Sequence, residues 1–197
     1  ESESISQHFF EVSSDEERLT ALRLLLLEHV PESTVVFCNT KREAQDVTDT
    51  LIDEGFSALD LTGDLEQRDR DQTLVQFANK SISILVATDV AARGLDIDNL
   101  DAVINYELAQ DPESHVHRIG RTGRAGATGE AISLVCADEY SDLVGIERLI
   151  QKLIPRKELE GYEPEKPLPK SSLKAPPKKK KPKKNKNPKS GSFKKPS

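Results

Sequence analysis

The sequence predicts an α/β fold in which a parallel sheet is covered by helices on both faces. Several apolar runs consist almost only of Val, Ile and Leu, as strands buried on both faces require. These runs alternate with segments of helical pattern as far as about residue 153. Hydrophobic residues make up 36% of the 197 residues, which suffices for one core because they are concentrated before the carboxy-terminal part.

Each expected strand is a short apolar run, and most connections between the runs contain a helix. Such connections are right-handed crossovers between parallel strands. In chain order the strands are expected to be HFFEV at 8–12, TVVFC at 34–38, SALDL at 57–61, SILVAT at 83–88, AVINY at 102–106 and EAISLVC at 130–136.

Helices are expected at 15–28, 41–54, 66–79, 112–119 and 139–153. The helix at 112–119 has the clearest start, because Pro112 suits a first turn and Asp111 and Glu113 lie beside it. In a parallel sheet, ligand-binding residues collect in the loops beyond the carboxyl ends of the strands. The polar sequences expected there are residues 39–42, 62–64 and 88–96, and the loop with Arg121 and Arg124.

The charge divides the chain into two parts, expected as a folded domain at 1–160 and a tail at 161–197. Residues 1–165 carry 15 Lys and Arg against 34 Asp and Glu, whereas residues 166–197 carry 13 Lys and no acid. With one Phe and two Leu after residue 166, the tail cannot bury enough apolar area to offset its chain entropy. We expect a disordered Lys/Pro-rich segment that holds RNA non-specifically.

The two cysteines and the apolar runs indicate the compartment. Cys38 and Cys136 each lie in an apolar run and have no CxxC partner, which favours buried reduced thiols in a cytoplasmic protein over a disulfide framework or a zinc site. No apolar stretch approaches the ~20 residues that span a bilayer, and the first residues form no signal-peptide pattern, so no membrane partner is expected. No residue is assigned as a metal ligand.

Residues 117–124, HRIGRTGR, place three arginines at three-residue spacing with glycines between them. An arginine is a rigid, positively charged fork that matches phosphate oxygens, so the cluster suits a transferring phosphoryl group. A solvated basic loop is the alternative. Glycines interleaved with arginines after a helix favour a fixed backbone and a function.

Three segments resemble motifs IV, V and VI of DEAD-box RNA helicases: VFCNT at 36–40, ATDVAARGLDI at 87–97 and HRIGRTGR at 117–124. The likeness extends from about residue 6 to residue 155, and residues 63–74 resemble the bacterial DbpA type within the family. The resemblance implies a RecA-like carboxy-terminal lobe, one of two lobes that close around ATP and single-stranded RNA. The DbpA type normally continues into an RNA-recognition domain, where this chain has Lys/Pro sequence instead.

The resemblance also implies that half of the active site belongs to another lobe. The 197 residues contain no GxxxxGK[ST] phosphate loop, no Asp-Glu-Ala-Asp and no Ser-Ala-Thr, and they open with Glu1. We therefore expect a segment of a longer protein, inactive alone, whose ATP and Mg²⁺ are held mainly by the amino-terminal lobe.

Residue roles follow from the same resemblance. Arg121 and Arg124 match arginine fingers that reach the γ-phosphate, and Asp96, after Gly94, matches a carboxylate that accepts hydrogen bonds from the ATP ribose. A turn or helix cap is the alternative for Asp96. The residues that match interlobe positions are Arg93, His117 and Arg118, and for His117 a structural role is as well supported as a catalytic one.

RNA contacts carry over to Thr88 and Arg70, with weaker candidates at Asn39, Thr40, Lys41, Gly63 and Gln67. Such groups would grip phosphates along one strand without reading bases. Gln67 and Arg70 also fit an exposed helix surface, and Thr62 stands where the family commonly has His. The implied partners are RNA, the amino-terminal lobe and ribosomal RNA precursors. Two alternatives to an RNA helicase lobe are a non-catalytic RNA-binding module and a DNA-directed helicase of the wider superfamily.

Overall fold

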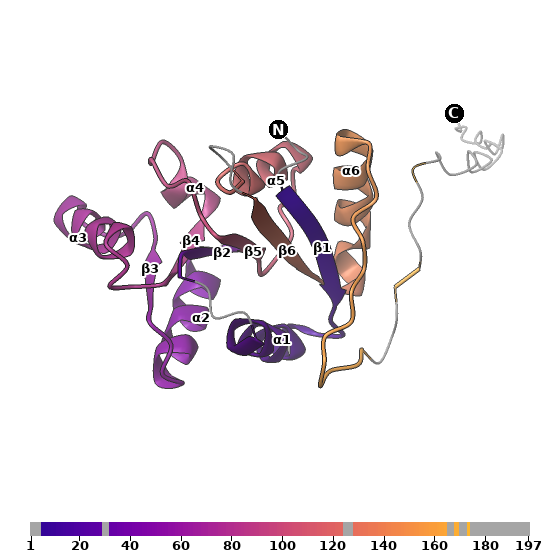
Figure 1. Ribbon diagram of the computed structural model, residues 1–197, viewed down its shortest axis with the longest axis horizontal. Helices are drawn as coiled ribbons and strands as arrows, with labels where there is room; N and C mark the ends of the chain where they lie inside the picture. The colour runs from indigo at the N-terminus through magenta and orange to yellow at the C-terminus, as the bar shows by residue number, and fades with distance from the viewer. Residues whose placement is uncertain (1–4, 29–31, 124–127, 165–167, 170–172, 174–197) are drawn as a thin grey trace, which may run out of the picture.

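The computed structural model describes residues 5–28, 32–123, 128–164, 168–169 and 173. Within these residues the chain forms the expected parallel sheet with helices on both faces (Figure 1). The strands are β1 (Ile5–Glu11), β2 (Thr34–Cys38), β3 (Ala58–Leu61), β4 (Ile84–Thr88), β5 (Ala102–Asn105) and β6 (Gly129–Val135). The predicted fold class is confirmed.

The six strands of this sheet lie in the order β1-β6-β5-β2-β4-β3, and every neighbouring pair is parallel. β2 lies between β4 and β5, with Val35 opposite Leu85 on one side and Val103 on the other. All five residues of β2 and of β4 are buried, which explains why these runs carry no polar alternation. The expected strand at 34–38 coincides with β2, and β1 begins earlier than expected, at Ile5.

The helices are α1 (Asp15–Glu28), α2 (Lys41–Asp53), α3 (Gln67–Ala78), α4 (Asp89–Ala92), α5 (Pro112–Ile119) and α6 (Tyr140–Ile150). The helix α4 was not predicted from the sequence, because a single turn is too short to show a helical period. The start expected at residue 139 is also slightly wrong, since a 3₁₀ turn at Ala137–Glu139, labelled η2, precedes α6.

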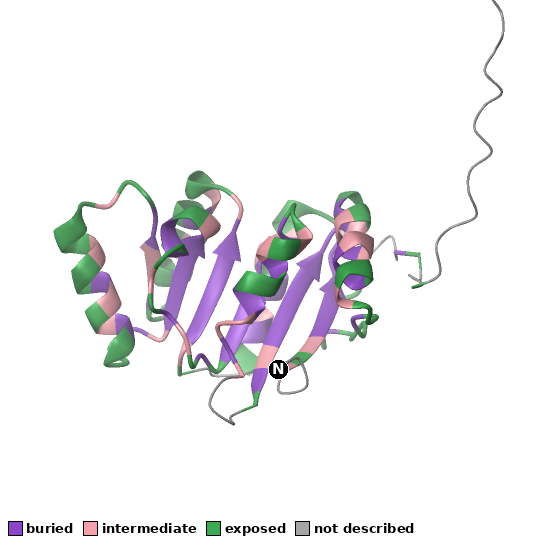
Figure 2. Cartoon of the chain, turned by 90° about the horizontal axis from the view of Figure 1, so that it is seen from above, coloured by how far each residue is buried: buried purple, intermediate pink, exposed green. Residues whose placement is uncertain are grey.

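Alternate strand residues face two helical layers. Val36 and Cys38 pack toward α1 and α2, whereas Val35 and Phe37 pack toward α3 and α4. A third cluster joins β1 to α6 on that second side, where Figure 1 also shows α5. Figure 2 shows the strands buried between helices whose outer faces are exposed. The sheet is thus the centre of the core, and its strands β2, β4 and β5 are buried throughout.

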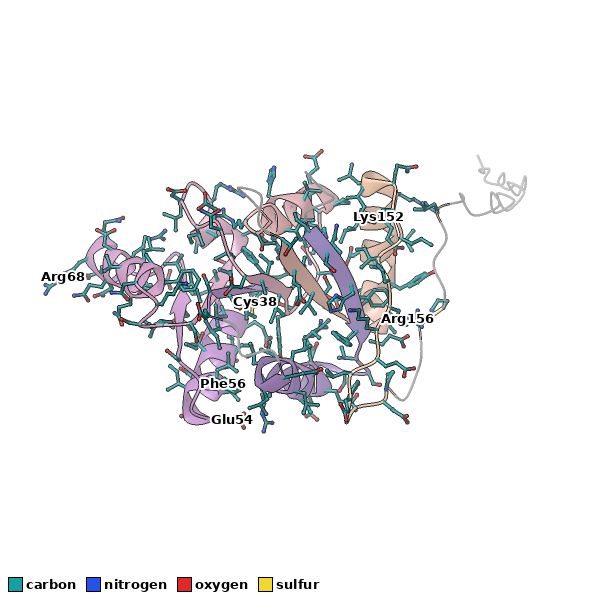
Figure 3. All side chains as sticks on the ribbon, in the orientation of Figure 1. Cys38, Glu54, Phe56, Arg68, Lys152 and Arg156 are labelled. Carbon is teal, nitrogen blue, oxygen red and sulfur yellow. The ribbon has the colours of Figure 1, made fainter. Side chains whose placement is uncertain are left out.

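The segment after α6 covers the outer edge of β1. Phe9 donates its N–H to the Pro155 carbonyl at 2.9 Å, and Lys157 donates to the Phe9 carbonyl at 2.9 Å. Arg156 forms an ion pair with Glu11, and Figure 3 shows Arg156 beside β1.

Packing continues beyond the domain boundary expected at residue 160. Leu168 is buried and donates its N–H to Glu11 Oε2 at 2.8 Å, and the Tyr162 hydroxyl accepts from Ser13 N at 2.9 Å. The division of the chain at residue 160 stays a prediction. The tail expected to be disordered lies outside the described residues, except at 161–164, 168–169 and 173.

Candidate functional site

The predicted site residues gather at the carboxyl edge of the sheet. Asn39 follows β2, Gly63 lies beyond the end of β3, and Thr88 ends β4. His117 and Arg118 lie on α5, which follows β5. Because all the strands are parallel, these loops leave the sheet on the same side, as the sequence predicted.

Arg118 is at the centre of this edge, and its side chain is only 1% exposed. Its Nε and Nη2 donate to the two carboxylate oxygens of Asp89 at 2.8 and 2.7 Å. Nη1 donates to Asn105 Oδ1 at 3.2 Å and to the Glu107 carbonyl at 2.8 Å. Nη2 also donates to Asn39 Oδ1 at 2.8 Å. Every N–H of the guanidinium therefore has an acceptor.

These contacts make Arg118 a brace within the domain. Its guanidinium lies 5.0 Å from the centre of the Phe37 ring, so it is packed as well as hydrogen-bonded. The ends of β2 and β5 and the start of α4 are thereby joined to α5. A bidentate arginine–carboxylate pair fixes orientation as well as distance. The further interlobe role expected for Arg118 stays a prediction.

No role was predicted from the sequence for Asp89, Asn105 or Glu107. Asp89 begins α4, and Glu107 accepts the Asn39 N–H at Oε1 at 2.8 Å in addition to its carbonyl bond with Arg118. The signal for Asp89 was its place directly after a buried strand, within the segment at 87–97. No local pattern marks Asn105, because its burial depends on the neighbouring strand β6, where it donates to Ser133 Oγ at 3.0 Å.

A second buried cluster, formed by Arg18 and Glu139, supports the segment around Glu107. Arg18 of α1 donates to Glu139 Oε1 at 2.8 Å and to the carbonyl of Tyr106 at 2.8 Å. Glu139 Oε2 in turn accepts the Leu108 N–H at 2.9 Å. Burial raises the pKa of Glu139 and outweighs the opposing effect of Arg18. The backbone on either side of Glu107 is therefore held from α1 and from η2.

The candidate RNA residues after β2 already have partners inside the domain. The Asn39 side chain donates to the Leu108 carbonyl at 3.0 Å, as well as accepting from Arg118. The Thr40 hydroxyl caps α2 by accepting the Glu43 N–H at 3.1 Å. Lys41 forms an exposed ion pair with Asp64. Asn39 is half-buried, whereas Thr40 and Lys41 are exposed.

Gly63, Gln67 and Arg70 lie around the start of α3. A side chain at Gly63 would meet no heavy atom within 4 Å, so packing within the domain does not require glycine there. Gln67 donates to Asp71 Oδ1 at 2.8 Å on the exposed helix surface. Arg70 donates to the Ala91 carbonyl at 3.1 Å, which links α3 to α4.

Thr88 has a definite structural role as the cap of α4. Its hydroxyl accepts the Ala91 N–H at 3.3 Å, and the residue is 7% exposed. A hydroxyl that accepts one hydrogen bond can still donate its own hydrogen. The expected RNA contact is therefore compatible with the cap.

Arg121 lies beside the loop that follows α4. Its Nη1 donates to the carbonyls of Leu95 and Ile97 at 3.2 and 3.0 Å, and its Nη2 donates to the carbonyl of Ala92 at 2.9 Å. Arg124, the second expected finger, lies outside the described residues. The structure thus places one of the two arginines.

A cavity of about 220 Å³ is lined by Arg121, by Gly94 and by the expected interlobe residues Arg93, His117 and Arg118, and Asp96 is not among the residues that line it. Gly94 has a φ of +76°, a conformation that favours glycine, and the side chain of Asp96 is exposed. The cavity is lined by Phe37, Asp89, Ala92, Arg93, Gly94, Ser114, His117, Arg118 and Arg121. A larger cavity of about 950 Å³ lies between β1 and residues 156–164, and the residues that line it include none of the predicted site.

His115 is a buried titratable group on α5, the helix that also carries His117 and Arg118. Its Nε2 lies 3.1 Å from Gln7 Oε1, and its Nδ1 has no hydrogen-bond partner. Burial, together with the positive charge of Arg118, lowers the pKa of His115 to about 4. The imidazole is therefore neutral near pH 7, unlike a surface histidine that is partly charged.

None of the helices in the described part of the chain has the length and apolar character needed to cross a membrane. The one cluster of possible metal ligands found there is Cys136, Asp138 and Glu139, away from the cavity. In that cluster Glu139 already accepts from Arg18, so it is part of the packing described above.

The fold and site define a class of protein. A parallel sheet with arginines and a positive-φ glycine around one cavity at its carboxyl edge, and an exposed carboxylate on the adjoining loop, is the construction of a RecA-like helicase lobe. The chain belongs to the helicase conserved C-terminal domain family, whose model matches residues 17–126.

Curated relatives narrow the comparison to DEAD-box RNA helicases. The chain is 61% identical over 142 residues to the ATP-dependent RNA helicase DbpA of Escherichia coli K12, which covers 72% of this chain and 31% of that protein. It is 47% identical over 142 residues to the ATP-dependent RNA helicase RhlB of Photorhabdus laumondii, at 72% and 33% coverage. The chain thus spans about a third of the length of these relatives.

Solved structures of DEAD-box proteins also resemble this chain in fold. The Escherichia coli DEAD-box protein SrmB, solved bound to the regulator of ribonuclease activity A, superposes with a TM-score of 0.80 at 30% identity over 85% of this chain and 98% of that one. A DEAD-box protein of Methanococcus jannaschii gives 0.74 at 44% identity, over 79% and 42%. Dbp5 of S. cerevisiae, solved bound to RNA and ADP BeF3, gives 0.75 at 30% identity, over 80% and 42%.

Proposed function

We propose that this chain is the carboxy-terminal lobe of an ATP-dependent DEAD-box RNA helicase. The lobe would supply arginine fingers and RNA-backbone contacts while the parent protein separates short RNA duplexes. The observation that carries the proposal is the position of Arg121, which lies beside the loop of Gly94 and Asp96 and next to the braced Arg118. The relatives named ATP-dependent RNA helicases support it.

Asp96, Gly94 and Arg121 suit the part of an ATP site that contacts the ribose and the γ-phosphate. The exposed Asp96 carboxylate can accept hydrogen bonds from ribose hydroxyls, and the turn at Gly94 keeps the approach open. Arg121, with Arg124, would neutralise the charge that develops on a transferring γ-phosphate. Because these 197 residues contain no phosphate loop, the phosphates and Mg²⁺ belong mainly to the amino-terminal lobe in this proposal.

We assign RNA binding to the loops after β2, β3 and β4. Lys41 offers an exposed ammonium, Arg70 a guanidinium and Thr88 a hydroxyl, which together suit the phosphates of one strand. The open space at Gly63 supports a close approach of the RNA backbone. Weaker contacts are assigned to Asn39, Thr40 and Gln67.

Closure of the two lobes would link RNA and ATP through the brace. Asn39, next to the RNA loops, bonds directly to Arg118, and Arg118 bonds to Asp89 at the start of the loop region that carries Asp96. Arg93 and His117 line the cavity and are the proposed interlobe contacts. RNA on one side of the brace would thus favour the arrangement that brings Arg121 toward the phosphate.

The ATPase activity of the full-length protein tests the proposal. Turnover is measured with ribosomal RNA, an unrelated RNA of equal length, and DNA. We expect stimulation by RNA and little by DNA. Equal stimulation by DNA would assign the protein to a DNA-directed helicase group, and no ATPase with any nucleic acid would reject the enzyme. Preference for ribosomal RNA would support ribosomal precursors as the natural substrate.

We expect the isolated 197-residue chain to behave differently from the full-length protein. Lacking a phosphate loop, it should bind RNA without hydrolysing ATP, as a non-catalytic RNA-binding module would. We also propose a cytoplasmic location, which the two buried free cysteines, Cys38 and Cys136, support.

A further inference from the structure

The Arg121 guanidinium contacts three neutral backbone carbonyls, although the residue is assigned to a phosphate. Its guanidinium is held by the carbonyls of Ala92, Leu95 and Ile97. The Ala92 carbonyl is at the carboxyl end of α4, where helix carbonyls are partly negative. Hydrogen bonds from a guanidinium to phosphate are charge-assisted at both ends and are the stronger kind.

The loop gripped by Arg121 is the one that carries the proposed ribose carboxylate. Leu95 and Ile97 pack their side chains into the core with Val35 and Phe37, and Asp96 between them is exposed. The carbonyls on both sides of Asp96 therefore bond to one guanidinium. This grip, together with the two apolar anchors, decides where the Asp96 carboxylate points.

The main chain at Arg121 is fixed by other bonds. The Leu100 N–H donates to the Arg121 carbonyl at 3.1 Å, and the Thr122 hydroxyl donates to the Leu100 carbonyl. Leu100 and Thr122 also form an isolated parallel bridge. Because these bonds do not involve the guanidinium, the side chain can turn while its backbone stays in place.

We propose that Arg121 is a positioning residue for Asp96 in the free lobe, and that it exchanges the three carbonyls for phosphate when the lobes close. The phosphate part of this inference rests on the proposed function. One guanidinium cannot serve both sets of acceptors, so ribose recognition and finger engagement are coupled through Arg121. The loop is set before nucleotide arrives and is released as the finger engages.

The grip itself is tested on the 197-residue chain without nucleotide. Rotation of the Arg121 guanidinium about Nε–Cζ is followed by ¹⁵N NMR, with the exposed Arg68 of α3 as the internal comparison. We expect slow rotation at Arg121, with separate Nη signals, and fast rotation at Arg68. Equally fast rotation at both residues would overturn the proposal, and this measurement needs no variant.

Hydrogen exchange measures the effect on the loop. In Arg121→Gln, amides of residues 93–98 should exchange about tenfold faster than in wild type, because the carbonyl bonds are lost. Arg68→Gln is the matched control and should leave the loop unchanged. Unaltered exchange of β2 and β4 amides shows that the variant is folded. An unchanged loop in a folded Arg121→Gln variant would contradict the proposal.

The coupling is tested in the full-length protein by comparing Arg121→Lys with Arg124→Lys. Both keep a positive charge, so both should lower kcat. Only Arg121→Lys should also reduce the ratio of the affinity for ADP to that for 2′,3′-dideoxy-ADP, by about tenfold, because with no γ-phosphate to engage it Arg121 still positions Asp96 in wild type. An unchanged ratio in Arg121→Lys would refute the coupling. Absence of RNA-stimulated ATPase in wild type would instead refute the proposed function and leave the NMR result standing.

Discussion

At the scale of single residues, the site depends on charges that are paired within the domain. Arg118 and Asp89 share two hydrogen bonds, and Arg118 is buried while the Asp89 side chain is 32% exposed. A buried guanidinium that loses its carboxylate keeps its desolvation cost without compensation. The pair is therefore more important for keeping Arg118 in place than its net contribution to stability would suggest.

Asp89→Asn should lower the free energy of unfolding by about 2 kcal/mol, because an amide offers one acceptor where the carboxylate offers two charged ones. Urea denaturation of the chain measures this. Asp53→Asn, on the exposed face of α2, is the control and should change stability by less than about 0.5 kcal/mol. Equal effects of the two substitutions would mean that the pair does not stabilise the domain.

At the scale of an element, α5 combines a clear start with a buried interior side. Asp111 caps the helix by accepting the Glu113 N–H at 3.4 Å, Pro112 follows, and Arg118 is buried near the other end. His115 lies on the same buried side, one turn before Ile119. The helix thus couples the brace to a histidine that the fold keeps neutral.

The pKa of His115 predicts how stability varies with pH. Its ordinary pKa of 6.5 falls to about 4 in the folded domain, so between these values the unfolded chain binds more protons. Stability from this residue is complete above pH 6.5 and is lost as pH falls toward 4. Between pH 7 and pH 5 the loss should be about 2 kcal/mol.

Comparison with His115→Gln isolates this contribution. The pKa values of Glu43, Asp60, Glu139 and Asp142 are raised by burial and act in the opposite direction, but they do so equally in both proteins. The stability difference between wild type and variant, from urea denaturation, should therefore shrink as pH falls from 7 to 5. A constant difference would show that His115 titrates as it does in the unfolded chain.

At the scale of the whole molecule, the chain separates its charges. The acidic part up to residue 165 contains the folded core, and eleven of the 13 tail lysines come after residue 173. The last packed contact described is near Leu168, which is buried against β1 and α6. A truncation can therefore remove most of the basic charge without touching the core.

Deleting residues 174–197 should leave the unfolding free energy within about 0.5 kcal/mol and weaken RNA binding mainly at low salt. The slope of the logarithm of affinity against the logarithm of salt concentration should become shallower, because fewer counterions are released. Fluorescence anisotropy with a single-stranded RNA measures both. A chain truncated after residue 164 serves as the comparison. It also lacks Leu168, so its free energy of unfolding should be lower than that of the chain without residues 174–197. An unchanged slope would show that the tail makes no RNA contact.

Much of the fold was predictable from local sequence. Apolar runs identified all six described strands, and several of these runs were near-continuous, since a strand buried on both faces cannot be polar at alternate positions. The helix at 112–119 was predicted with the correct bounds, and its proline and flanking acids marked its start. The short helix α4 was missed, because one turn leaves no periodic pattern.

Local sequence was sufficient to predict the fold class, the edge of the sheet that carries the candidate site residues, and the family. Only the tertiary structure decided how the side chains are used: Arg118 pairs with Asp89, Asn39 turns inward to Arg118, and Arg121 grips backbone carbonyls. The physical reason is range. Periodicity and capping are local, whereas the partner of a buried guanidinium comes from strands that are adjacent in the sheet and far apart in the chain.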